Sequence, residues 1–232
     1  MSGLLPAEVR QVVGEMAVRY QTLPREPSLE KESGRVISGR DGQIVAIQPN
    51  IRAVMEAPPG KHLKLRVLKI KPMYRSEDLM TANHCIGYYA TGVGGNSQRH
   101  TNITLACEAL NNTVIWPGQI FSFNDVVGPR TPERGYLPAP IILKGQHDID
   151  YGGGVCQAAS TIYNAMLESG LKLIERHAHS KPVPYVDKGR DATVGYGYMD
   201  LRFHNGYDYP VIIKAGMHSG KLEVQILGRE KK

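Results

Sequence analysis

The sequence predicts an α+β protein: a small N-terminal α+β module over residues 1–75, followed over residues 76–232 by a mixed α/β domain that ends in antiparallel strands. Three observations support this class. Apolar residues recur at helical spacing in separate stretches, short strand-like runs lie between them, and the C-terminal end consists of strand-like runs separated by turns containing Gly, Asn and Asp. Polar residues at Arg75–Asp78 mark the predicted boundary.

The first module is predicted to contain two helices and three strands. Pro6–Tyr20 has proline at the first helical position and one apolar face, which is typical of a surface helix. Arg35–Ser38 and Gln43–Ile47 are separated by a glycine-containing turn and are predicted to pair as a hairpin. A short helix over Asn50–Ala57 and a strand over Leu63–Leu68 complete the module.

The second domain is predicted to begin with a strand over Cys85–Ala90 and a helix over Gln98–Leu110. The helix presents Cys107 on its apolar face, so this cysteine is predicted to be a core residue. Val114–Trp116 and Ile120–Phe123 flank a Pro-Gly turn and are predicted to form a second hairpin. A further short strand leads from there to a run of glycines.

The glycine run is predicted to open a helix that extends from Val155 to a cap at Gly170. Leu171–Ile174 follows as a strand, and the remainder of the chain is predicted to be strands and turns. The predicted strands of this last part are Ile141–Leu143 before the helix and, after it, Thr193–Tyr196, Leu201–His204, Val211–Lys214 and Leu222–Leu227.

Composition and charge indicate a globular protein with an anionic partner. No run approaches the about 18 apolar residues of a membrane span, and residues 1–6 lack the features of a signal peptide. The net charge of +6 comes from lysines and arginines that are spread along the chain rather than clustered with aromatic residues, so no nucleic acid partner is expected. Anionic wall polymers or a membrane surface suit the same charge. With no export signal in view, a cytoplasmic location stays open.

Cys156 is the predicted nucleophile. The chain has three cysteines, an odd number that indicates no disulfide framework. Gly152–Gly154 and Val155 precede Cys156, so this thiol is predicted to lie in the first turn of its helix. The partial positive charge of a helix start lowers a thiol pKa, and the thiolate is the reactive form.

His177 and His179, which follow the next strand, are the candidate bases for this thiol. Asp191 is the carboxylate predicted to orient the base. Residues two apart on an extended segment point the same way, so both histidines are expected to face Cys156 or both to face away from it. A solvated or structural histidine pair is the alternative. A zinc site built from the same residues is disfavoured because no Cys-x-x-Cys pair is present, so no metal and no cofactor are expected.

Six further residues are predicted to line the substrate site: Gly154, Ser160, Tyr163, Arg99, Asn102 and Arg190. The arginine at 190 suits bidentate binding of a substrate carboxylate, and the amides around residue 154 suit an oxyanion. The residues after the cysteine lie about one helical turn or more away from it. Surface turn, capping and simple packing are the alternatives for these positions.

Several motifs in order resemble the VanW-like domain of bacterial cell-envelope proteins, over about residues 85–215. They are Asn102-Ile103, Pro117–Asn124, Val127–Thr131, Arg134–Tyr136, Gly152–Gln157, Tyr163–Ala165, Glu175–Ser180 and Gly189–Val194. Residues 23–71 more loosely resemble a shortened peptidoglycan-binding segment.

The resemblance implies a function, because some members of this family are understood as L,D-transpeptidases that cross-link peptidoglycan through a cysteine. Cys156 matches that cysteine, and His179 matches the histidine of the family's His-Ser step. The implied partners are peptidoglycan stem peptides, and the implied location is extracellular or in the cell wall. A non-catalytic wall-binding or glycopeptide-resistance accessory module, and a Cys-His peptidoglycan hydrolase, are the alternatives.

Overall fold

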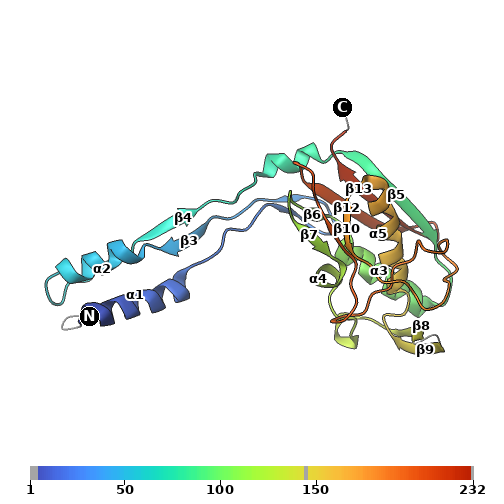
Figure 1. Cartoon of the computed structure of the whole chain (residues 1–232), viewed down its shortest axis with the longest axis horizontal. Helices are drawn as coiled ribbons and strands as arrows, with labels where there is room; N and C mark the ends of the chain where they lie inside the picture. The colour runs from blue at the N-terminus through green and yellow to red at the C-terminus, as the bar shows by residue number, and fades with distance from the viewer. Residues whose placement is uncertain (1–4, 144–145, 231–232) are drawn as a thin grey trace. The chain divides into compact units, whose positions relative to one another are not determined.

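The structure is a computed structural model that describes residues 5–143 and 146–230 (Figure 1). The chain folds as two compact units. Residues 5–28 and 37–76 form the first unit, and residues 29–36 and 77–230 form the second. Helices and antiparallel sheets make up the chain, which confirms the predicted α+β class.

The first unit packs two helices beside a two-stranded sheet. Helix α1 (Pro6–Tyr20) has the predicted bounds, and α2 (Ile47–Glu56) begins three residues before the predicted helix. Strand β3 (Gly42–Val45) pairs antiparallel with β4 (Val67–Ile70), which starts later than the strand predicted from residue 63. The buried core of this unit is small and consists of Val9, Val13 and Val45.

The first predicted hairpin is wrong. Strand β2 (Val36–Ile37) pairs with β1 (Ser28–Leu29) instead of with β3. Isolated bridges from Thr22 to Gln43 and from Arg25 to Arg40 occupy the edge that the hairpin required. The alternating pattern identified strand-forming residues, but it carried no information about their partners.

The second unit is built on a four-stranded antiparallel sheet in the order β5 (His84–Gly92), β13 (Lys221–Gly228), β12 (Val211–His218) and β6 (Thr113–Ile115). A second, three-stranded sheet has the order β10 (Lys172–Glu175), β11 (Arg202–His204) and β7 (Ile120–Ser122). Short helical segments accompany these sheets: η1 (Ser76–Thr81), α4 (Phe123–Val127) and η2 (Pro132–Arg134).

The second predicted hairpin is also wrong, because β6 and β7 belong to different sheets. Asn205 separates them. Its side-chain Nδ2 donates to Ile115 O at 2.8 Å, and its backbone N donates to Gln119 O at 2.9 Å. Its backbone O accepts from Gly118 N at 2.8 Å. A residue from a distant part of the sequence thus holds the two strands apart.

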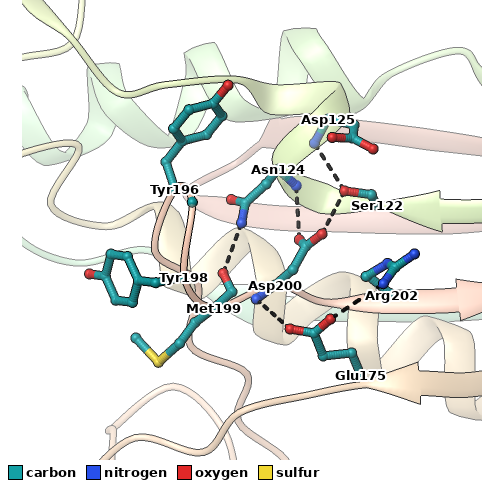
Figure 2. A pocket seen from close by; sticks show the side chains of 10 residues that line it. Ser122, Asn124, Asp125, Glu175, Tyr196, Tyr198, Met199, Asp200 and Arg202 are labelled. Carbon is teal, nitrogen blue, oxygen red and sulfur yellow. Dashed lines mark hydrogen bonds and ion pairs between the residues drawn. The ribbon is translucent and has the colours of Figure 1, made fainter.

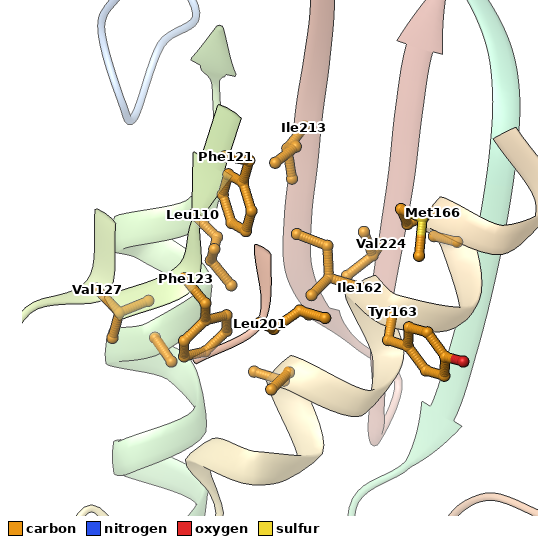
Figure 3. Packing of buried hydrophobic residues seen from close by; sticks show 14 of the residues in the cluster. Leu110, Phe121, Phe123, Val127, Ile162, Tyr163, Met166, Leu201, Ile213 and Val224 are labelled. Atoms are coloured by element: carbon orange, nitrogen blue, oxygen red, sulfur yellow. The ribbon is translucent and has the colours of Figure 1, made fainter. Parts of the chain in front are cut away.

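Two helices cover the larger sheet and bury the main core. Helix α5 (Val155–Ser169) packs against β5 and β13, and α3 (Ser97–Leu110) packs against β12 and α5. Both helices agree with the prediction to within one residue, and Cys107 is buried as expected. Figure 3 shows Ile162 and Met166 of α5 within the same apolar cluster as Phe121 and Phe123. The rings of Phe121 and Phe203 stack with centroids 4.5 Å apart.

The strand predicted directly after α5 is present as β10, but two other segments differ from the prediction. The strand expected at 141–143 is part of β8 (Pro138–Leu143), which forms a hairpin with β9 (Gln146–Tyr151) immediately before the glycine run. The strand expected at Thr193–Tyr196 does not form, and this segment makes only isolated bridges, from Thr193 to His177 and from Gly195 to Met199.

Within residues 5–143 and 146–230, no helix combines the length and apolar character needed to cross a membrane.

A glycine in β5 allows α5 to lie close to the sheet. A Cβ atom at Gly87 would lie 2.2 Å from Ala165 O, whereas one at Gly92 of the same strand would meet nothing within 4 Å. We therefore expect Gly87→Ala to lower the free energy of unfolding by about 1–3 kcal/mol through overpacking. The matched control Gly92→Ala should change it little. Urea denaturation of both variants checks this, and equal stabilities would contradict the packing explanation.

Candidate active site

The start of α5 is fixed by a turn that requires glycine. Gly152 and Gly154 have φ values of 81° and 108°, a region that side chains disfavour. Asn102, which is fully buried, ties this turn to a neighbouring segment: its Nδ2 donates to Gly153 O at 3.0 Å and to Leu137 O at 2.9 Å. Leu137 N donates to its Oδ1 at 2.8 Å, so the side chain of Asn102 is engaged in supporting the turn.

This turn places Cys156 in the first turn of α5, half-buried against residues 193–194. Its Sγ lies 3.5 Å from Thr193 Oγ1 and accepts from Val194 N at 3.5 Å. The imidazole of His179 lies within electrostatic range of this thiol. The predicted nucleophile and one predicted base are therefore neighbours in the structure.

His179 is held by Asp191. The ring Nδ1 lies 2.7 Å from Asp191 Oδ2, and the backbone N of His179 donates to the same oxygen at 2.6 Å. Because Nδ1 is engaged, Nε2 is the ring nitrogen left for the thiol. The other carboxylate oxygen, Oδ1, accepts from Arg176 Nη2 at 2.9 Å. Hydrogen bonds therefore run from imidazole to carboxylate to guanidinium, and the thiol lies within electrostatic range of the imidazole.

The pKa values in this chain favour an ion pair. Burial alone would raise the pKa of Cys156, but hydrogen bonds from His179, Val194 and Thr193 bring that pKa below its ordinary value. For His179, burial opposes the charged form, yet the bonds and charges of Cys156 and Asp191 raise its pKa. For Asp191, burial is likewise outweighed by His179 and Arg176, so its pKa is lowered. All three directions favour thiolate, imidazolium and carboxylate.

His177 takes a different partner from His179. Its Nε2 lies 2.9 Å from Glu175 Oε1. The expectation that the two histidines face the same way fails, because residues 176–179 make only one isolated bridge and do not form a regular strand. The structure therefore brings Cys156, His179 and Asp191 together and engages His177 elsewhere.

Comparison with known proteins identifies the family. The family model described as VanW like protein matches residues 98–227. The chain belongs to the VanW-like family. It is 36% identical over 213 residues to the uncharacterized protein YoaR of Bacillus subtilis, covering 89% of this chain and 70% of YoaR. It is 33% identical over 112 residues to the vancomycin B-type resistance protein VanW of Enterococcus faecalis, covering 46% of this chain and 41% of that protein. No solved structure matches significantly.

Within the VanW-like region, several predicted substrate residues act as braces. Ser160 is fully buried, and its Oγ accepts from Ala192 N at 2.8 Å. Arg190 donates from Nη1 to Asn164 Oδ1 at 2.8 Å. Tyr163 is buried, and the Arg176 guanidinium lies 5.3 Å from the centre of its ring. The bonds of Ser160 and Arg190 fasten residues 190–192 to α5, which keeps the carboxylate at a fixed distance from the thiol.

Arg99 and Gly154 lie beside the thiol. Arg99 donates from Nε to Gly94 O at 3.0 Å and from Nη2 to Gln157 Oε1. Its charge is within electrostatic range of Cys156, and a Cβ at Gly154 would lie 2.5 Å from its Nη1. Arg99 thus adds positive charge at the helix start, where the family motif places the cysteine.

Two residues near Cys156 were missed by the sequence analysis. Burial raises the pKa of the Tyr185 phenol, which lies within electrostatic range of Cys156. Tyr185 lies in a proline-containing loop with no pattern that indicates a site. Arg130 lies within electrostatic range of Cys156. It belongs to the Val127–Thr131 motif, and that motif was the available signal for it.

A separate cavity of about 450 Å³ is shown in Figure 2. Its walls include Asn124, Glu175 and Asp200 together with the exposed Tyr196 and Tyr198. Cys156, His179 and Asp191 do not line it, so the cavity is distinct from the thiol site. In the described part of the chain, no group of three or more His, Cys, Asp or Glu side chains is arranged to hold a metal ion.

The lowered pKa of Cys156 can be measured by alkylation. At pH 7 iodoacetamide should label Cys156 faster than Cys107, because burial raises the pKa of Cys107 to about 12. It should also label Cys156 faster than Cys85, whose Sγ has the carbonyl of Gly87 as its partner rather than an imidazole. The rate at Cys156 should rise with pH through a titration below the ordinary thiol value of about 8.5.

Asp191→Asn should move that titration to higher pH, because it removes the charge that stabilises imidazolium. Peptide mapping by mass spectrometry over a time and pH series gives the rates. Cys156→Ser identifies the labelling that does not belong to this thiol. Faster labelling of Cys85 or Cys107 in the folded wild-type protein would contradict the assignment.

Proposed function

We propose that the protein is a peptidoglycan-modifying cysteine acyltransferase of the L,D-transpeptidase type that acts on wall stem peptides. The observation that carries the proposal is the grouping of Cys156, at the start of α5, with His179, whose ring is held by Asp191. A thiol, an imidazole and an orienting carboxylate in this order are the parts that nucleophilic acyl transfer requires. Arg176 acts on this chain as a positioning residue, through Asp191.

In the first half-reaction His179 takes the proton of Cys156, and the thiolate attacks the carbonyl between an L-centre and the terminal D-residue. The C–N bond breaks, the nitrogen receives the proton from His179, and the D-amino acid leaves. The acyl group remains on Cys156 as a thioester. In the second half-reaction an amine of a neighbouring stem peptide attacks the thioester, gives up a proton through His179, and releases the free thiol.

The helix start supports the negative oxygen that forms in both half-reactions. The amides of Val155 and Gln157 donate to Gly152 O and Gly154 O. The amide of Cys156 lies between them in the first turn, where helices have donors without intrahelical partners. We assign it the role of oxyanion donor, assisted by the partial positive charge of the helix and by the nearby Arg99.

Family membership supports the wall substrate. The relative from Enterococcus faecalis is named for vancomycin B-type resistance. Cys156 also lies in the motif that matches the cysteine of the family members understood as L,D-transpeptidases. We therefore include a cell-envelope location in the proposal, with stem peptides as substrate. The net charge of +6 suits the anionic polymers of such a surface.

The acyl-enzyme provides the direct test. A donor peptide supplied without an amine acceptor should add to Cys156 the mass of the donor minus its terminal D-amino acid, and an added amine should shorten the lifetime of this adduct. Intact-mass spectrometry over a pH series follows its formation, with Cys156→Ser and Cys156→Ala as controls. Turnover with water alone would indicate a hydrolase. Absence of any adduct from folded protein, across donors ending in D-residues, would indicate a binding module.

The two histidines provide a matched pair of variants. His179→Ala should slow acyl-enzyme formation by about 10²- to 10⁴-fold because the general base is lost. His177→Ala should leave the rate near that of the wild type, because His177 contacts Glu175 and not the thiol. Mass spectrometry of quenched samples measures both rates, and circular dichroism checks the fold. An inactive His177 variant beside an active His179 variant would assign the base to the other residue.

A further inference from the structure

Arg130 carries a donor that the folded chain leaves unused. Its Nη1 donates to Asn124 Oδ1 at 2.7 Å, and its guanidinium lies 5.5 Å from the centre of the Phe123 ring. Its Nη2 is buried and has no hydrogen-bond partner, and no other buried side-chain nitrogen or oxygen in residues 5–143 and 146–230 is in this state. A cationic donor without an acceptor is unfavourable, so such a group in a folded protein requires an explanation.

The guanidinium of Arg130 has neighbours in both the turn before α5 and the separate cavity. A Cβ at Gly152, in the turn that leads into α5, would lie 2.7 Å from Arg130 Cβ. The charge of Arg130 is within electrostatic range of both Cys156 and Asp200. Asn124, its partner, lines the separate cavity, as Asp200 does (Figure 2). Arg130 therefore lies beside the turn that leads to Cys156 and beside a residue of the cavity wall.

Arg99 already has acceptors for its guanidinium. Its Nε and Nη2 already donate to Gly94 O and Gln157 Oε1. Arg190, the residue predicted from the sequence to bind a carboxylate, donates to Asn164. Among these three arginines, only Arg130 has a buried guanidinium nitrogen that lacks an acceptor.

We propose that Arg130 binds a carboxylate of the substrate beside Cys156 and so selects donors with a free carboxyl end. A carboxylate supplies the acceptor that Nη2 lacks, and the planar guanidinium matches it with two parallel bonds. Arg130 as a whole is half-buried rather than fully enclosed. Resting on the proposed function, we identify the group as the α-carboxylate of the terminal D-residue, which leaves in the first half-reaction.

The first test does not depend on peptidoglycan chemistry. Iodoacetate and iodoacetamide alkylate the same thiolate, but only iodoacetate carries a carboxylate. The rate with iodoacetate divided by the rate with iodoacetamide should be higher at Cys156 in the folded protein than in the unfolded protein. Arg130→Gln should lower this ratio by about fivefold, the upper range for one partly exposed charge pair. Arg130→Lys should retain most of the ratio because it keeps the charge.

Arg134→Gln is the matched control, since Arg134 is exposed and donates to Pro129 O in the same segment. Its ratio should equal that of the wild type. A wild-type ratio no higher than that of the unfolded protein would overturn the proposal without any variant. An unchanged ratio in folded Arg130→Gln would overturn it as well.

The second test uses donor peptides with a free or an amidated carboxyl end. Wild-type protein should acylate faster with the free acid, and Arg130→Gln should remove this preference while iodoacetamide still labels Cys156. A preference that persists in the variant would overturn the role of Arg130 in the acyl transfer. If no donor of either kind forms an adduct, the proposed function fails, whereas the alkylation ratio still decides whether Arg130 receives a carboxylate.

Discussion

The candidate site depends on one carboxylate, that of Asp191. One oxygen forms two hydrogen bonds with His179, and the other accepts a hydrogen bond from Arg176. Arg176 also donates from Nε to Asp191 O at 2.6 Å, so side chain and backbone are held together. Hydrogen bonds to charged groups contribute about 1.5–3 kcal/mol each, which offsets the cost of placing this charge below the surface. Loss of the carboxylate would therefore release both the base and the segment that faces the thiol.

The sequence predicted the parts of this site that depend on local signals. A glycine run before an apolar stripe was enough to place the start of α5 and Cys156 within it, because backbone conformation and periodicity are properties of neighbouring residues. Asp191 and His179 were also named, from their order after the helix and from the family motifs. The structure joins them to Cys156, but their catalytic roles stay a proposal.

What the sequence could not predict is pairing between distant residues. Both predicted hairpins failed because strand-like alternation is independent of the strand's partner, and because Asn205 separates β6 from β7. The different partners of His177 and His179 depend on a segment that leaves regular strand geometry. Tyr185 and Arg130 were overlooked for a related reason. Their burial and neighbours exist only after residues from several elements have come together.

The close approach of α5 to β5 gives the site a mechanical dependence on a remote position. Gly87 faces Ala165, nine residues along α5 from Cys156, which is roughly 14 Å at 1.5 Å per residue. The helix is rigid over this length, whereas His179 and Asp191 belong to a separate segment. A side chain that tilts the helix at its far end would move the thiol together with Ser160 and Asn164, whose hydrogen bonds hold residues 190–192. A position that contacts no substrate can thus influence the chemistry through the orientation of the helix. A substitution there would lower activity although the residue is not part of the site.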